Sequence, residues 1–188
     1  MASIPIVSDL IDALKSLPAA LKEIPAAQTE ARSRLLDSVT TLGEAVSQAL
    51  NVVSVRCGTI ILKRENLGEF RQELVNSPSF LNEFRLSGVC AGLGKVRAEL
   101  RTLLSMQTLA VRLFQKKQLE ALLEQIQNKE RDLEEDFDRF FRDLSWRGAT
   151  LTEDEVPEVI QYLRDCRNKF EEDVSELRKA LRKVEETV

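Results

Sequence analysis

Apolar residues recur every three to four positions along almost the whole chain, which is the spacing of one face of an α-helix. The first such stripe consists of Ile6, Leu10, Leu14, Leu17, Leu21 and Ile24. Pro18 lies inside it, and because proline disrupts a helix interior, the pattern predicts either two short helices at about 8–17 and 18–24 or one kinked helix. Residues 1–25 are therefore predicted to form an amphipathic N-terminal segment.

A second stripe, from Leu35 to Ile60, predicts a long helix that ends near residues 63–66. Neither glycine nor proline occurs between Lys95 and Arg147, and one helix over that range would span roughly 80 Å. The stripe loses phase around Arg112, so we expect a break between Ser105 and Lys117. A single, very long helix is the alternative.

Two further stripes cover residues 119–144 and 156–188. They flank a polar turn in which Thr152 and Glu155 have the spacing of a capping box, so they predict an antiparallel helical hairpin. In the expected register Phe140 faces Leu163 and Leu133 faces Phe170. Aromatic side chains at helical spacing are usually core, and this set is assigned to the core of the hairpin: Phe137, Phe140, Phe141, Trp146 and Phe170.

These patterns predict an all-α fold, an elongated helical bundle with long antiparallel helices and a C-terminal helical hairpin. The expected organisation is an N-terminal segment 1–25, a bundle 26–118 and a hairpin 119–188 that belongs to the same domain. A length of 188 residues is ample for one hydrophobic core.

The composition excludes several kinds of chemistry. The chain has no histidine, which removes the commonest metal ligand and the usual base for a serine or cysteine nucleophile. We therefore expect no enzymatic activity, no metal and no cofactor. A net charge of −4 argues against nucleic acid as a partner. Three widely spaced cysteines, no evident signal peptide and no run of about 20 apolar residues favour the cytoplasm.

Two local motifs resemble ligand sites only superficially. The segment from Gly88 to Val96 approaches a phosphate-binding loop, but its glycine spacing is wrong and no hydroxyl follows Lys95. We expect Gly88, Ala91 and Gly92 to form instead a patch of small residues that lets another helix approach closely. The acidic run Asp132–Asp138 alternates with arginines and is expected to be a solvated helix face.

The sequence thus predicts a non-catalytic interaction or assembly module that acts through a protein partner or through self-association. The alternative is a membrane-active bundle of the cell-death or pore-forming type, which would insert its N-terminal segment into lipid. In either case the candidate contact face is the stripe Leu10, Leu14, Leu17, Leu21 and Ile24. Because this segment lacks aromatic residues and a cation-rich face, docking against the bundle or against a protein partner is favoured over a membrane.

Overall fold

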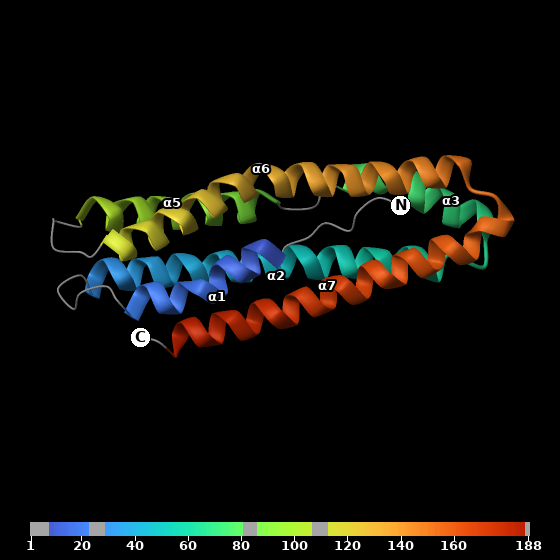
Figure 1. Ribbon diagram of the computed structural model, residues 1–188. Helices are drawn as coiled ribbons and strands as arrows, with labels where there is room; N and C mark the ends of the chain where they lie inside the picture. The colour runs from blue at the N-terminus through green and yellow to red at the C-terminus, as the bar shows by residue number, and fades with distance from the viewer. Residues whose placement is uncertain (1–7, 23–28, 81–85, 107–112, 187–188) are drawn as a thin grey trace.

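The structure, a computed structural model, describes residues 8–22, 29–80, 86–106 and 113–186. Its α-helices are α1 (Ser8–Lys22), α2 (Thr29–Leu62), α3 (Leu67–Val75), α5 (Leu86–Met106), α6 (Leu113–Thr150) and α7 (Val156–Glu185). Two short 3₁₀ helices, η2 (Ser77–Ser79) and η3 (Glu153–Glu155), complete the described elements (Figure 1). No strand occurs in these ranges, which confirms the predicted all-α bundle.

The bundle is elongated because two of its helices run along most of its length (Figure 1). At 1.5 Å per residue, the 34 residues of α2 and the 38 of α6 correspond to about 51 and 57 Å. The glycine-free stretch is divided between α5 and α6, which pack against each other, so a single helix over 95–147 is not formed. At the N-terminus, α1 continues through Pro18 as one helix.

The helices of one half form a closed ring of packing partners. Helix α1 contacts α6 and α7, α7 contacts α2, α2 contacts α5, and α5 contacts α6. Beyond the end of α1, the other half is made by α2, α7 and α6, with α3 packed against α6 (Figure 1). One continuous hydrophobic core contains residues of all three predicted segments, from Leu10 through Leu42 to Val184.

The C-terminal helices run antiparallel from a short turn but then separate. Helix α7 packs along α2, whereas α6 packs along α3 and α5, and α1 occupies the space between α6 and α7 (Figure 1). The ring centre of Phe170 lies 5.9 Å from that of Phe140 and 6.4 Å from that of Phe137. The predicted partner of Phe170 was Leu133, which lies farther along α6 from the turn than either phenylalanine. The pairing differs from the predicted seam because the two helices do not stay adjacent.

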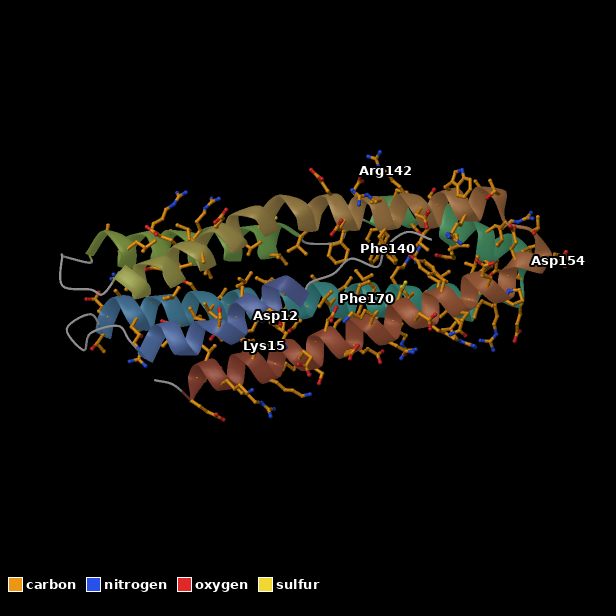
Figure 2. The ribbon with its side chains drawn as sticks, in the orientation of Figure 1. Asp12, Lys15, Phe140, Arg142, Asp154 and Phe170 are labelled. Atoms are coloured by element: carbon orange, nitrogen blue, oxygen red, sulfur yellow. The ribbon has the colours of Figure 1, made fainter. Side chains whose placement is uncertain are left out.

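Large aromatic side chains fill the space across which α6 and α7 face each other. Figure 2 shows Phe140 and Phe170 pointing toward one another from the two helices, in an edge-to-face arrangement. Phe141 is buried, and its ring contacts that of Phe80. The assignment of Trp146 to this core is wrong, because its side chain is 66% exposed. It lies on the solvent side of α6, away from the ring contacts.

The turn between α6 and α7 is fixed by specific polar contacts. The predicted capping box is present: the Thr152 backbone N–H and hydroxyl both donate to Glu155. These hydrogen bonds lower the pKa of the Glu155 carboxyl. Leu151 is buried beneath the turn, and Arg71 of α3 donates to its carbonyl oxygen. The turn is thereby tied to α3 as well as to the start of α7.

The close-packing patch is divided between two faces of α5. Gly92 is buried, and a Cβ at this position would lie 3.1 Å from Cα of Leu42 in α2. Gly88 would make an ordinary contact, 3.8 Å from Cβ of Ala45. Ala91 is exposed and takes no part in this approach. The whole segment is helical, so the backbone has no loop that could cradle a phosphate.

Replacing Phe140 by alanine should lower the free energy of unfolding by about 3–5 kcal/mol, because a fully buried aromatic ring leaves a cavity. Trp146→Ala is the control and should change it by less than about 0.5 kcal/mol, because the indole is mostly in solvent. Urea denaturation followed by circular dichroism measures both. Similar losses in the two variants would contradict the described core.

Two glycines of α5 provide a matched test of close helix packing. Gly94→Ala should stabilise the protein by about 0.5–1 kcal/mol, because alanine favours the helix and no atom lies within 4 Å of the added Cβ. Gly92→Ala should lose that gain or destabilise, because the Cβ meets the backbone of α2. Thermal melts of the two variants decide this. Equal stabilisation would show that α5 and α2 are not so close.

Candidate functional site

The most unusual surface feature is a row of exposed apolar side chains on α2. Val52, Val55 and Leu62 are 42%, 68% and 76% exposed, and with Thr59 they follow one another at steps of three or four residues. Such spacing places all four on one face of the helix. We call these four residues the α2 stripe. Its opposite face, which includes Val53, Cys57 and Ile60, is fully buried in the core.

A groove between α2 and α7 runs along one side of the α2 stripe. It has a volume of about 570 Å³, and α2 lines it with Ser54, Val55, Gly58 and Leu62, among others. Three arginines also line it: Arg64, just beyond α2, and Arg164 and Arg167 of α7. We call this hollow the α2–α7 groove. It combines apolar side chains with three guanidinium groups in one concave surface.

A second hollow of about 340 Å³ lies on the other side of the α2 stripe. Its walls include Val52, Thr59 and the ring of Phe80. Arg56 covers that ring at 5.3 Å, and its Nη2 atom lies 2.7 Å from a carboxylate oxygen of Glu73. The charge of Arg56 is therefore neutralised within the bundle. The α2 stripe therefore lies between two hollows. Of these two, the α2–α7 groove is lined by arginines without an ion partner in the described ranges, whereas the arginine of the second hollow is paired with Glu73.

The rim of the α2–α7 groove is positive although the whole chain is acidic. No Asp or Glu occurs between Glu44 and Glu65, so the exposed half of α2 contributes no negative charge. Arg64 and Arg164 are exposed, and within the described ranges neither forms an ion pair. Both could meet an anionic group of a ligand without first breaking an internal salt bridge.

Glu171 is the one acidic side chain that lines the α2–α7 groove in the described structure, and it is already engaged. Arg167 Nε donates to its Oε1 over 2.8 Å, and Ser54 Oγ donates to the same atom over 3.2 Å. The hydrogen bond from Arg167 is the main cause that lowers the pKa of the Glu171 carboxyl. Glu171 therefore stays ionised and holds Arg167 in place, which leaves Arg64 and Arg164 as the available cations.

The predicted N-terminal contact face is turned inward. Leu10, Leu14 and Leu17 are each 1% exposed and pack where α1 meets α6 and α7. Leu21 belongs to α1, but its side chain is outside the described part, and Ile24 lies outside the described residues altogether. On the outer side of α1, Lys15 pairs with Asp12 and with Glu176 of α7, each at 3.4 Å (Figure 2).

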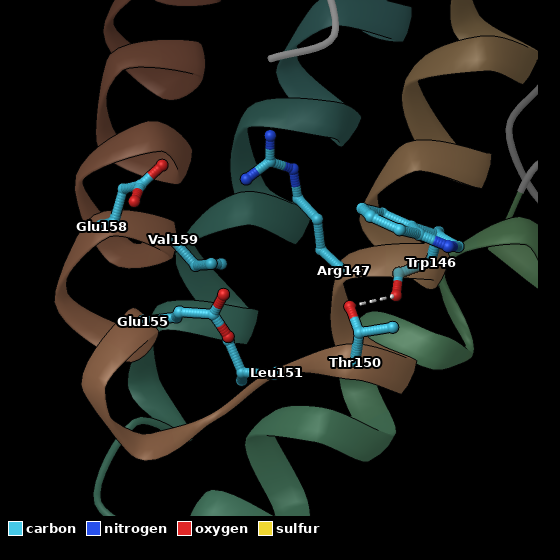
Figure 3. Close-up of a pocket in the computed structure, with 7 residues that line it drawn as sticks. All are labelled: Trp146, Arg147, Thr150, Leu151, Glu155, Glu158 and Val159. Atoms are coloured by element: carbon cyan, nitrogen blue, oxygen red, sulfur yellow. Dashed lines mark hydrogen bonds between the residues drawn. The ribbon is translucent and has the colours of Figure 1, made fainter.

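A smaller hollow of about 130 Å³ lies at the turn between α6 and α7 (Figure 3). The Trp146 indole borders it, and Glu155 and Glu158 approach it from the start of α7. Arg147 spans the space between the helices, where it pairs with Asp143 at 2.9 Å and covers the ring of Tyr162 at 5.3 Å. Because Arg147 and Glu155 are both committed to structural contacts, this hollow has few free groups for a ligand.

The other groups capable of chemistry are scattered or inert. Among the described residues, no group of three or more His, Cys, Asp or Glu is placed to hold a metal ion. Burial raises the pKa of the Cys57 and Cys166 thiols to about 12, which makes both poor nucleophiles. The described acids of the run 132–138 include Asp136 and Asp138, which pair with Arg139 and Arg142 on the same helix.

One described helix, α2, is long and apolar enough to cross a membrane by length and composition. This differs from the expectation that no such segment is present. Half of its apolar window is buried inside the bundle, and the central helix of a water-exposed bundle meets the same criteria. The high hydropathy of α2 is explained by its two apolar faces, one in the core and the other forming the α2 stripe.

Sequence reasoning missed the α2 stripe and the arginines beside it. The signal was the absence of acidic residues over the second half of α2, where apolar residues occur around the helix instead of on one face. The arginines carried no local signal, because Arg164 and Arg167 lie a hundred residues along the chain from α2 and reach it only through the packing of α7.

If α1 is a docked structural helix, Leu14→Glu should lower the free energy of unfolding by about 3 kcal/mol or more, because it places a charge in the core. Ser16→Glu, at an exposed position of the same helix, is the matched control and should have little effect. The intact protein should not float with anionic phospholipid vesicles. If the intact chain and Ser16→Glu both float with the vesicles but Leu14→Glu does not, membrane insertion of α1 would be supported instead.

No family model, no curated protein and no solved structure matches this chain. The function is therefore inferred from the residues of the chain and their geometry.

Proposed function

We propose that this protein is a non-catalytic helical interaction module that binds another protein chain through the α2 stripe and the α2–α7 groove. The observation that carries the proposal is the exposure of Val55 and Leu62 on a helix whose opposite face is completely buried. Isolated exposed apolar side chains are common, but a row of them between two hollows marks a contact surface.

The energetics favour a partner on this surface. Covering an aliphatic side chain that is otherwise exposed contributes about 1.5–3 kcal/mol, so Val55 and Leu62 together can provide a large part of a moderate binding free energy. The hollows beside them accept side chains of a partner, and depressions of this kind are where anchor residues of interfaces insert. The partner is another protein or a second copy of this chain.

The absence of evident catalytic groups in the described residues supports a non-enzymatic role. Neither the α2–α7 groove nor the hollow near Phe80 contains a cysteine, and the chain contains no histidine. The carboxylate in the groove, Glu171, is held ionised by Arg167 and Ser54, which suits a structural anchor better than a proton donor. None of the three cysteines forms a disulfide bond, which fits a reducing compartment, and we propose the cytoplasm.

The alternative of a membrane-active bundle receives less support. Inserting α1 into lipid would require Leu10, Leu14 and Leu17 to leave the core, and the space between α6 and α7 would then open to water. The α2 stripe is also a poor lipid anchor, because interfacial helices use bulky aromatic residues and its apolar members are all aliphatic. Protein contact is the function that needs no rearrangement of the described structure.

Site-specific photocrosslinking tests the proposal. A photoreactive phenylalanine analogue is placed at Leu62 of the full chain, and a matched variant carries it at Trp146, an exposed apolar position on α6. Irradiation in extracts of the cells that natively express the chain, and in purified samples, should give a discrete crosslinked protein from position 62 that position 146 does not give. Identical or no products from both positions would contradict a contact surface on α2.

A further inference from the structure

We propose that the partner segment is an acidic amphipathic helix of about three turns that lies along the α2–α7 groove. Its apolar edge covers the α2 stripe, and its carboxylates meet Arg64 and Arg164. This inference rests on the proposed function and specifies the chemistry of the partner. It is carried by the juxtaposition of an exposed aliphatic row on α2 with two exposed, unpaired guanidinium groups within the described surface.

The shape of the surface favours a helix as the occupant. From Val52 to Leu62 the α2 stripe extends about 15 Å, which equals about three helical turns. The exposed side chains follow steps of three and four, so a partner helix with apolar residues at the same steps can interdigitate with them. Helices α2 and α7 pack against each other along this groove and present it to a third helix. No described element offers a strand edge for an extended peptide.

The charge of the groove selects an acidic partner over a neutral or basic one. Arg167 is neutralised by Glu171, while Arg64 and Arg164 line the groove without ion partners in the described ranges. Carboxylates from a docked helix can form bidentate hydrogen bonds with such guanidinium groups, and these strengthen as the apolar contact excludes water. A basic helix would meet two like charges and no free acid in the groove.

A second copy of this chain and a lipid surface fit the groove less well. The most acidic segment of the chain lies on α6, where Asp136 and Asp138 are already paired with arginines on the same helix. A bilayer surface is flat on this scale, whereas the α2 stripe is a ridge with a hollow on each side. An acidic helix of a separate protein satisfies both the apolar row and the free arginines, so it is the occupant that we assign.

The test uses the full chain and a designed fluorescent peptide of about 18 residues, with leucines spaced by three and four and glutamates on both flanks. The control peptide has the same leucines with every glutamate replaced by lysine. Fluorescence anisotropy should show saturable binding of the glutamate peptide that weakens as salt is raised. The lysine peptide should bind at least about tenfold more weakly.

Variants of the chain show whether the peptide occupies the assigned groove. Leu62→Asp should reduce affinity for the glutamate peptide by about tenfold or more, because it removes an apolar contact and adds repulsion. Val75→Asp, at an exposed valine on α3, is the control and should leave affinity unchanged. Thermal melts of each variant verify that the bundle remains folded. Equal losses in Leu62→Asp and Val75→Asp would overturn the assigned location.

Reversing the charge of the two arginines tests the acidic chemistry of the partner directly. The double variant Arg64→Glu and Arg164→Glu should lose affinity for the glutamate peptide and bind the lysine peptide more tightly than the wild-type chain does. Unchanged preference in this variant, or equal binding of both peptides by the wild-type chain, would overturn the acidic partner. A third outcome is that the chain binds neither peptide but floats with anionic vesicles, and that Leu62→Asp abolishes this flotation. The ligand of the groove would then be a lipid surface and not a helix.

The failure of this inference can be told apart from failure of the proposed function. A discrete protein crosslinked from Leu62, together with no preference for the glutamate peptide, would leave the contact surface intact and refute only the acidic chemistry. If that protein is a second copy of the chain, the surface is a self-association interface. If no position-specific crosslink forms and no peptide binds, both the proposed function and this inference are refuted.

Discussion

The packing of large aromatic rings between α6 and α7 is the constraint on which the rest of the bundle depends. Phe140 and Phe170 meet edge to face with ring centres 5.9 Å apart, and Phe137 extends the contact along α6. Rings of this size hold their helices farther apart than aliphatic residues would. The helices leave the turn as neighbours in sequence and then diverge, and α1 occupies the space that opens between them.

The position of α1 determines which surfaces remain free. By covering the inner sides of α6 and α7, α1 completes the core with Leu10, Leu14 and Leu17 and closes the ring of helices on that side. Helix α7 then has α1 on one side and α2 on the other, so the groove between α7 and α2 faces outward. The described apolar stripe of the N-terminal segment is thus packed into the core, and the exposed apolar row lies on α2.

Helix α2 combines two roles that usually belong to separate elements. One face contributes Val53, Cys57 and Ile60 to the core, and the other presents Val52, Val55 and Leu62 to solvent. A helix that is apolar all round is normally buried all round. An exposed apolar row of this kind is a feature of interaction surfaces, and it is the basis of the proposed partner contact. In the proposed interface, Arg64 and Arg164 would add specificity to an otherwise non-directional hydrophobic contact.

The sequence by itself determined the helical class, the approximate helix boundaries and the capping box at Thr152, because these depend on residue spacing and on hydrogen bonds within a few residues. It predicted a break between Ser105 and Lys117 but left one long helix as the alternative, and only the packing of α5 against α6 decided between them. It did not determine which helices are neighbours. Trp146 and Phe140 belong to one aromatic cluster in the sequence, but they lie about 120° apart around α6, and the first is exposed whereas the second is buried. The groove, too, required tertiary structure, since Leu62 and Arg164 share a surface only after α7 packs against α2. Local spacing specifies a face of a helix, whereas the partner of that face is decided by how side-chain volumes from distant segments fill one core.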